Sequence, residues 1–475
     1  MDIQDFRLHA HSLVDWMADY MENVRDYPVK SQAAPGDVIA RLPKHPPENG
    51  ESFEAIFQDF SDIVMPGITH WQHPSFFAYF PANSSPPSVL GEMLMATLGA
   101  QCMSWQTSPA AAELEERVTG WLRDMIGLPR TFTGVIQDTA TTATLCSLLT
   151  AREKVSAYRI NEHGFAGEPV FAVYCSSETH SSIEKDVKIA GLGRENLRKI
   201  AVDESFAMRA DKLAEAIEQD LSNGIVPLCV VATLGTTGST AIDPLAEIAA
   251  VCARHNIWLH VDAAFAGTAL LLPEFRWMSK GIEHADTIVF NAHKWMFTNF
   301  DCSLYFVKDP DALIRTFDIL PEYLKTQEDS RVNNYRDWGI QLGRRFRALK
   351  LWFVIRSYGV SGLQQLLRHH IACARRLAKH IETAPDFELL APVSTALVCF
   401  RYHPVGVDAL DELNDLNENL LERLNLTGTI YLTHTKLSGV YTLRMVTAQT
   451  GVTQDDVEQA WVLVVGTARE PEASK

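Results

Sequence analysis

Between residues 170 and 307, short apolar runs alternate with segments of helical periodicity, and this alternation limits the possible folds more than any other feature of the chain. Near-continuous apolar runs are typical of parallel strands that are buried on both faces. Apolar residues that recur every three or four positions indicate amphipathic helices. A domain with a mostly parallel sheet and interleaved helices is therefore expected. The runs are 170–175, 228–234, 257–261, 287–290 and 303–307, and the helical segments are 114–126, 143–154, 211–221 and 245–255.

Two further regions flank this α/β domain. Residues 1–27 carry apolar side chains at helical spacing, and a second helix is expected at 53–64. An apolar helix without a core of its own must pack on another surface, so a homodimer is expected. From residue 361 the pattern alternates helix and strand. The expected domains are an N-terminal helical dimerisation segment (1–85), a large α/β domain (86–360) and a small C-terminal α+β domain (361–475).

The overall charge and the cysteines limit the partners and the compartment. The formal net charge is −17, which argues against nucleic acid or an anionic membrane surface as a partner. No signal peptide is recognisable, and no apolar stretch has the length of a membrane span. The eight cysteines are scattered and several lie in apolar runs, which is typical of reduced core residues. A cytoplasmic protein is therefore expected.

Lys294 follows the apolar run 287–290, within Asn291-Ala-His-Lys-Trp295. An unpaired ammonium group is expensive to bury, so a lysine at the end of a buried strand tends to lose its proton. A neutral amine is the nucleophile that Schiff-base chemistry requires. The alternative is a structural lysine whose stem lies along the strand end while its ammonium group reaches water.

Two other polar residues follow apolar runs, at the edge where sheets of this kind bind ligands. Asp262 follows 257–261, and the small residues after it would let a flat ring lie against Ala264. A carboxylate there would keep a pyridinium nitrogen protonated, as pyridoxal phosphate chemistry requires. The alternative is an aspartate that caps the next helix. His180 follows 170–175 and could stack on the other ring face as an acid or base, or lie on a surface loop.

Hydroxyl groups lie at three further positions where a ligand could bind. Residues Thr139, Ala140 and Thr141 precede an apolar helix, where amides and hydroxyls bind phosphate; the alternative is ordinary N-capping. Thr237 follows 228–234 and is placed to contact a ligand. Tyr323 precedes a polar stretch that is expected to form a loop, whose closure would let the phenol deliver a proton. Tyr335 is a second candidate for that role, and a packed tyrosine is the alternative.

Residues 70–81 are strongly aromatic. Trp71, Tyr79 and Phe80 are expected to line a pocket for a flat substrate, or else to belong to the core. The spacing of His70 and His73 is that of metal ligands, but no third ligand is evident. No metal site is therefore expected.

Together these motifs resemble the pyridoxal-phosphate-dependent aromatic-L-amino-acid decarboxylases (group II). The motifs occur in the family's order from about residue 6 to residue 465. The resemblance implies the fold of aspartate aminotransferase (fold type I) and an obligate dimer whose active sites lie at the subunit interface. The segments that carry it are Asn291–Trp295, His260–Ala264, Ala232–Thr237, His180–Ser182, Phe77–Pro81 and Leu342–Arg347.

The resemblance also implies a role for each residue. Lys294 would form the Schiff base with the cofactor, Asp262 would bind the pyridinium nitrogen, and His180 would stack on the ring. Tyr323 would protonate the substrate carbon after CO2 leaves. Thr237 would lie at the edge of the ring that carries the hydroxyl. The implied phosphate ligands are Ala140, Thr141, Asn291 and His293, and the implied substrate pocket is Trp71, Tyr79, Phe80 and Pro81, with Gln101 and Met103 from the partner chain.

Two departures from the family pattern and one match bear on the subgroup and the substrate. Animal members have Gly-Ser-Ala-Ser where this chain has Asp138-Thr-Ala-Thr141; Thr141 preserves the hydroxyl, and Asp138 predicts a bacterial-type member. Gln101 and Met103 stand where animal members have apolar side chains. Gly343 resembles members that accept bulky aromatic substrates, whereas histidine-specific and some tyrosine-specific members tend to carry serine there.

The expected reaction is loss of CO2 from an aromatic L-amino acid, such as tyrosine, DOPA, tryptophan, 5-hydroxytryptophan or phenylalanine, to give the aryl-ethylamine. Three alternatives are an aromatic-aldehyde synthase, a decarboxylase of glutamate or another acidic substrate, and a non-catalytic protein that binds pyridoxal phosphate. Tyr323 argues against the first, since the synthases typically have phenylalanine there. The aromatic segment around Trp71 argues against the second.

Overall fold

The structure, a computed structural model, describes residues 1–319 and 331–470, so Tyr323 lies outside the described residues. The chain divides into two compact units. The larger unit comprises residues 82–375 and 391–398, and the smaller one comprises 1–81, 376–390 and the described part of 399–475. The predicted boundaries at residues 85 and 360 stay a prediction.

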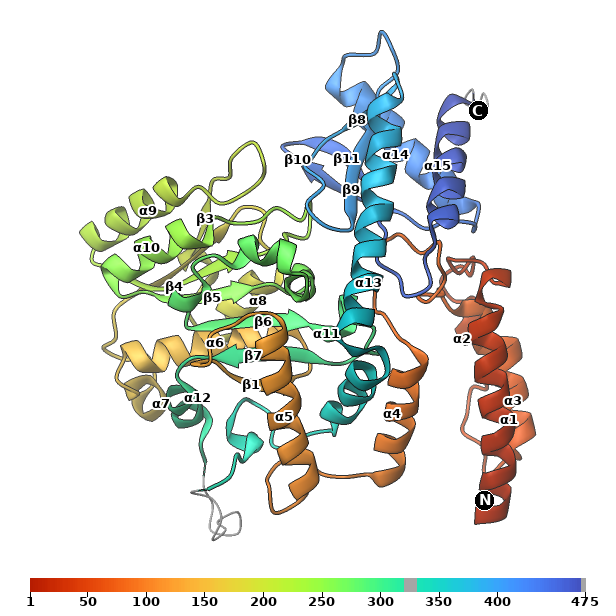
Figure 1. The fold of residues 1–475 in the computed structure, drawn as a ribbon, viewed down its shortest axis with the longest axis horizontal. Coiled ribbons are helices and arrows are strands. Elements are labelled where there is room, and N and C mark those ends of the chain that lie inside the picture. Colours follow the sequence, from red (N-terminus) through yellow and green to blue (C-terminus); the bar gives the residue numbers. More distant parts are fainter. Residues whose placement is uncertain (320–330, 471–475) are drawn as a thin grey trace. The chain divides into compact units, whose positions relative to one another are not determined.

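The larger unit contains a seven-stranded sheet in the order β1-β7-β6-β5-β4-β2-β3 (Figure 1). All neighbours run parallel except β7, which is antiparallel to β1 and β6. The strands are β1 (Thr133–Gln137), β2 (Phe171–Ser176), β3 (Leu197–Ile200), β4 (Val226–Thr233), β5 (Trp258–Asp262), β6 (Thr287–Asn291) and β7 (Ser303–Val307). The prediction of a mostly parallel sheet is confirmed.

The run 303–307 was expected among the parallel strands and is antiparallel. Residues 292–302 connect β6 to β7. This segment is shorter than the crossover of a dozen or more residues that parallel strands need. The chain therefore turns back beside β6.

Helices cover both faces of this sheet. Neighbouring residues of a strand point to opposite faces, and in β2 they contact different helices. On β2, Val173 and Cys175 pack in one apolar cluster with Leu148 of α6 and Val187 of α8. Tyr174, between them, donates a hydrogen bond to Asp220 of α9 (Oη to Oδ2 2.7 Å). The helices of the larger unit are α4 (Pro86–Leu98), α5 (Pro109–Met125), α6 (Ala140–Val155), α7 (Arg159–His163), α8 (Ser182–Ile189), α9 (Ala210–Ser222), α10 (Leu245–His255), α11 (Ala292–Trp295) and α12 (Pro310–Phe317). Helix α13 (Arg347–Thr383) begins in this unit, and its residues after 375 belong to the smaller one.

The smaller unit has a four-stranded sheet in the order β10-β11-β9-β8, in which β10 pairs with β11 and β8 with β9 in antiparallel fashion. Its strands are β8 (Phe387–Leu389), β9 (Leu397–Tyr402), β10 (Thr433–Leu437) and β11 (Val440–Val446), and its helices include α2 (Asp37–Arg41), α14 (Leu410–Leu426) and α15 (Gln454–Arg469). An α+β arrangement follows, as the alternating pattern predicted.

The N-terminal segment also belongs to the smaller unit. Helices α1 (Ile3–Glu22) and α3 (Phe53–Asp59) lie side by side (Figure 1). Trp16 contacts Phe57 and Phe60 edge-on, with ring centroids 5.9 and 5.4 Å apart. Several other apolar side chains of α1 are exposed; Ile3 is 66% exposed and Phe6 53%. None of the helices in the described part of the chain has the length and hydropathy needed to cross a bilayer.

Candidate active site

The candidate site of the larger unit lies at the carboxyl ends of its parallel strands. Strand β5 is hydrogen-bonded to β4 on one side and β6 on the other, so residues that follow these strands emerge at one edge. Asp262 ends β5, Asn291 ends β6, and Lys294 lies on the short helix α11 directly after it. His180 follows β2, the parallel neighbour of β4. The structure thus brings together residues far apart in sequence, as predicted.

Lys294 is half-buried. Its surroundings lower the pKa of its amine by desolvation, and the negative charge of Asp262 acts in the opposite direction. A lowered pKa raises the fraction of neutral, nucleophilic amine at neutral pH. The direction of this pKa shift is the one that the sequence predicted.

Asp262 is held at the strand end by a local hydrogen bond. Its Oδ1 accepts from the backbone amide of Ala264 at 3.0 Å. The carbonyl of Ala264 in turn accepts from the amide of Asn291 at 2.9 Å. These bonds join the ends of β5 and β6, so that Asp262 and the segment bearing Lys294 have a fixed spacing. Only a methyl group projects from Ala264, which leaves room for a flat ring.

His180 has a defined tautomer. Its Nδ1 accepts a hydrogen bond from the backbone amide of Ser182 at 3.2 Å, so in the neutral ring the proton is on Nε2. Burial of the ring nitrogens, followed by the positive charge of Lys294, lowers the pKa of His180. The imidazole is therefore neutral at neutral pH, although part of its side chain is exposed.

Thr237 lies exposed in the turn after β4. Its neighbour Thr236 is buried and stabilises the turn, because its Oγ1 accepts from the amide of Ala241 at 3.1 Å. Gly235 has φ +91°, and a Cβ there would lie 2.6 Å from the Cβ of Ala266. The turn thus depends on a glycine and presents Thr237 outward.

The turn before α6 combines both of the interpretations that the sequence allowed. Thr139 caps the helix, and its Oγ1 accepts from the amide of Thr142 at 3.3 Å. Ala140 and Thr141 form the first turn, whose amides have no acceptor within the helix. Such an end attracts anions. The cap and the candidate phosphate site are therefore one structure.

Ser303 joins the phosphate turn to β6 and was not predicted. It lies opposite Gln137 of β1 and opposite Asn291 of β6, because β7 pairs with both strands. Its Oγ is 2.6 Å from Asn291 Oδ1 and 3.3 Å from the carbonyl of Asp138. The contact fixes the Asn291 carboxamide. A serine at the start of an apolar run was the only sequence signal.

His293 is buried and neutral. Its Nδ1 accepts from the amide of Cys302 at 2.9 Å, which leaves the proton on Nε2. Burial, with a smaller contribution from the charge of Lys294, lowers the pKa of His293 to about 3. A neutral imidazole with a fixed Nε2–H is a hydrogen-bond donor suited to an anion.

Trp295 is a core residue that packs and hydrogen-bonds within the larger unit. It is fully buried, stacks on Phe265 (centroids 4.7 Å apart, 9° between planes) and donates from Nε1 to His370 Nδ1 at 3.0 Å. The indole thus joins α11 to Phe265 and to His370 of α13.

Four of the predicted substrate residues lie in the smaller unit. Trp71 and Tyr79 are exposed and stack on each other, with centroids 5.8 Å apart and planes at 15°. Tyr79 has φ +52°, a strained value for a non-glycine residue. The guanidinium of Arg444 lies over the ring of Phe80 at 5.4 Å, and Pro81 is buried.

His70 and His73, which have metal-ligand spacing, make other hydrogen bonds: the Nδ1 of His70 lies 2.8 Å from Tyr20 Oη, and the Nδ1 of His73 accepts from the amide of Ser75. Across residues 1–319 and 331–470, no cluster of three or more metal-ligating side chains occurs.

Gln101 and Gly343 line one cavity of about 400 Å³ in the larger unit. The Oε1 of Gln101 accepts from the amide of Arg344 at 2.8 Å, and a Cβ on Gly343 would lie 3.3 Å from Gln101 Nε2. Met103 is half-buried, and its carbonyl accepts from the amide of Arg336. Lys294, Asp262 and His180 do not line this cavity.

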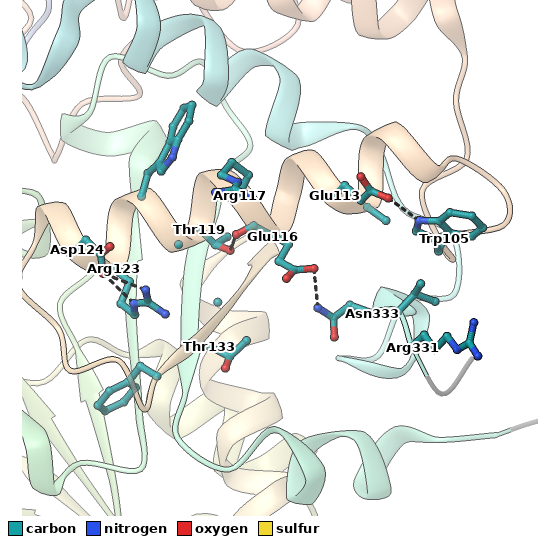
Figure 2. A pocket seen from close by; sticks show the side chains of 16 residues that line it. Trp105, Glu113, Glu116, Arg117, Thr119, Arg123, Asp124, Thr133, Arg331 and Asn333 are labelled. Atoms are coloured by element: carbon teal, nitrogen blue, oxygen red, sulfur yellow. Dashed lines mark hydrogen bonds and ion pairs between the residues drawn. The ribbon is translucent and has the colours of Figure 1, made fainter. Parts of the chain in front are cut away.

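A larger cavity of about 670 Å³ lies beside α5 and residues 331–333 (Figure 2). Its wall includes hydrogen bonds from Trp105 Nε1 to Glu113 (2.9 Å) and from Asn333 to Glu116 (3.1 Å) (Figure 2). None of the predicted site residues lines it.

Tyr335 is a packed core residue: burial raises the pKa of its phenol well above the usual value, which does not suit a proton donor.

Comparison with known proteins identifies the family. Residues 35–403 match the model described as the pyridoxal-dependent decarboxylase conserved domain. The chain belongs to this family. It is 43% identical to tyrosine decarboxylase 4 of Petroselinum crispum, over 97% of this chain and 92% of that protein. It is 42% identical to phenylacetaldehyde synthase of Arabidopsis thaliana, over 98% and 96%.

Among solved structures, the chain is similar to Oryza sativa TDC with PLP and tryptamine, with a TM-score of 0.95, 35% identity and 98% of each chain covered. The fold is accordingly the α/β fold type I of pyridoxal-dependent decarboxylases. The residues present fit the cofactor: a lysine whose amine pKa is lowered, a carboxylate one strand away, and a helix N-terminus with a neutral histidine donor for a phosphate.

Proposed function

We propose that the chain is a carboxy-lyase that removes CO2 from an aromatic L-amino acid and releases the aryl-ethylamine, with pyridoxal 5′-phosphate as cofactor. The observation that carries this proposal is the position of Lys294. Its amine is partly buried, its pKa is lowered, and it interacts electrostatically with both Asp262 and His180 at one edge of the sheet. The similarity to a tyrosine decarboxylase and to a protein solved with tryptamine supports an aromatic substrate.

When bound, pyridoxal phosphate supplies an aldehyde that joins covalently to amines and a ring that accepts the electrons of the bond to CO2. Lys294 would hold the cofactor through its amine. The carboxylate of Asp262 would bind the ring nitrogen and hold a proton there. Ala264 and His180 would contact the ring, and Thr237 would contact its hydroxyl group.

Phosphate binding is assigned to the turn before α6 and to the residues after β6. Thr139, Ala140 and Thr141 supply amides and hydroxyls, and His293 donates from Nε2. Asn291 contributes its carboxamide, which Ser303 orients. Tyr323 is assigned the return of a proton to the substrate carbon.

Substrate recognition is assigned through the family resemblance. Trp71, Tyr79, Phe80 and Pro81 would contact the aromatic ring from one chain, and Gln101, Met103 and Gly343 would do so from the partner. The preferred substrate is best identified by an amine-release assay with tyrosine, DOPA, tryptophan, 5-hydroxytryptophan and phenylalanine.

The proposed assembly is a homodimer. The uncovered apolar side chains of α1, among them Ile3, Phe6 and Val14, support it. A monomeric mass at micromolar concentration in analytical ultracentrifugation would refute it. A cytoplasmic location is also proposed, because all eight cysteines are buried and none forms a disulfide. The bacterial-type assignment rests on Asp138 alone, whereas the relatives named above are plant proteins.

A second candidate function is aldehyde synthesis, in which decarboxylation is coupled to oxidative deamination. The similarity to a phenylacetaldehyde synthase favours it. Tyr323 favours simple decarboxylation. The ratio of amine to aldehyde and peroxide in the product mixture separates the two.

Replacing Lys294 by alanine tests the proposal. The variant should lose both the absorbance of lysine-bound cofactor and CO2 release, because no other group supplies the amine. Lys308→Ala, at the far end of β7, is the control and should keep both. Undiminished CO2 release from purified Lys294→Ala would refute the assignment.

A further inference from the structure

Asp186 is a fully buried carboxyl whose two oxygens have no hydrogen-bond partner. It lies on the inner face of α8, beside the core residues Ile183 and Val187. Other buried carboxylates of the same unit are satisfied: Asp243 accepts from two backbone amides, Glu115 pairs with Arg344, and Glu153 pairs with Arg152. An unsatisfied buried carboxylate is costly, so Asp186 needs an explanation.

The position of Asp186 connects it to the candidate active site. Helix α8 begins two residues after His180. The charge of Asp262, at the end of β5, acts on Asp186, and Asp186 in turn acts on Cys146 of α6. Among the described residues, the cation that acts on it is Lys185, the exposed neighbour on its own helix. Asp186 is therefore buried within reach of the charge of Asp262 and has no hydrogen-bond donor of its own.

The chemistry of these surroundings determines the protonation of Asp186. A carboxyl without donors in an apolar environment is more stable as the neutral acid. Burial raises the pKa of Asp186 to about 8, and the charge of Asp262 contributes to the increase. Its proton is thus retained at neutral pH.

We propose that Asp186 is a positioning residue of the cofactor site, a neutral carboxylic acid near Asp262 that leaves Asp262 alone to carry the negative charge opposite the cofactor's ring nitrogen. This inference rests on the proposed function. Ionisation of Asp186 places a second negative charge behind Asp262. That charge strengthens the hold on the proton of the ring nitrogen, and it changes the absorbance and the affinity of the bound cofactor.

The test is a pH titration of the purified holoenzyme and of Asp186→Asn, which has nearly the same shape but cannot ionise. The absorbance of the bound cofactor in the parent protein should show a transition near pH 8 that the variant lacks. The dissociation constant of pyridoxal phosphate should change several-fold across that transition in the parent and stay constant in Asp186→Asn. Asp186→Ala should abolish the same transition.

Asp286→Asn is the matched control. Asp286 is also a carboxyl whose pKa burial raises, but it lies before β6, at the opposite edge of the sheet, where it accepts from the amide of Leu259 at 2.8 Å. This variant should change the pH dependence of stability and leave the cofactor titration as in the parent. Identical cofactor titrations for the parent, Asp186→Asn and Asp186→Ala would overturn the inference. A parent protein that fails to bind pyridoxal phosphate would instead refute the proposed function.

Discussion

Arg344 and Glu115 form a buried ion pair that joins three segments of the larger unit. Arg344 Nη2 lies 2.7 Å from Glu115 Oε1 and 2.7 Å from the carbonyl of Ile136. The same Glu115 oxygen accepts from the amide of Ile136 at 2.8 Å. The pair thereby connects α5 and β1 to the segment that carries Gly343.

Removing one partner of this pair should be far more costly than removing both. Arg344→Met leaves Glu115 buried without its countercharge and should lower the free energy of unfolding by about 3–5 kcal/mol. The double variant Glu115→Leu/Arg344→Met should recover most of that loss. Urea unfolding measures both. A single variant within about 1 kcal/mol of the parent protein would contradict the expectation.

The residues that pattern reasoning found for the site are those that follow strands buried on both faces. Asp262, Lys294 and His180 were identifiable because each follows the end of an apolar run, Asp262 directly and the other two after a few residues. Ser303 and Asp186 were not. Ser303 lies between β1 and β6, because β7 pairs with both strands, and only the order of strands in the sheet reveals this. The role of Asp186 depends on what surrounds one face of α8, and a single charged residue in a helical pattern is ordinarily a solvated one.

At the level of secondary structure, the strands that the pattern missed are all at sheet edges. They are β1 and β3 in the larger sheet and β8 and β10 in the smaller one. An edge strand has one neighbour and carries polar side chains, as do Arg198 and Lys199 in β3, so it lacks the continuous apolar run. The central strands were predicted within two residues of their observed ends.

Helix α13 contains one local interruption, at Gly359. Gly359 has φ 62° and ψ 170°, a combination open almost only to glycine. No atom lies within 4 Å of the position where a Cβ would stand. The requirement for glycine is therefore one of backbone conformation alone.

Gly359→Ala should destabilise the protein by about 1–3 kcal/mol through backbone strain. Gly120→Ala, on helix α5, is a matched control. It also has open space around its Cβ but no positive φ, and it should be neutral or slightly stabilising. Thermal unfolding of both variants measures the difference. Equal unfolding temperatures for the two variants would show that an alanine at 359 causes no backbone strain.

For the whole molecule, acid stability should depend on buried neutral histidines. His260 is fully buried, and its ring nitrogens lie 3.0 Å from Thr144 Oγ1 and 2.8 Å from Thr287 Oγ1. Burial lowers the pKa of His260 to about 4. Between about pH 6.5 and 4, the unfolded chain therefore binds a proton that the folded chain does not, and stability falls as the pH falls.

His260→Gln removes this contribution to the pH dependence. The variant should be less stable at pH 7.5, because it loses hydrogen bonds. Its further loss between pH 7.5 and 4.5 should be smaller than that of the parent by about 2 kcal/mol. Chemical unfolding at the two pH values gives both differences. Parallel pH profiles would show that His260 is not the titrating group.

Trp295, the immediate neighbour of Lys294, gives the molecule an optical property. Its indole is sealed from water and lies parallel to Phe265, so its emission should appear at short wavelength. A chromophore attached to Lys294 that absorbs in the near ultraviolet would accept energy from this indole and dim it. The chain has ten tryptophans, and the difference spectrum between the parent and Trp295→Phe isolates this one. The fluorescence of Trp295 should therefore report the fraction of molecules that carry the cofactor.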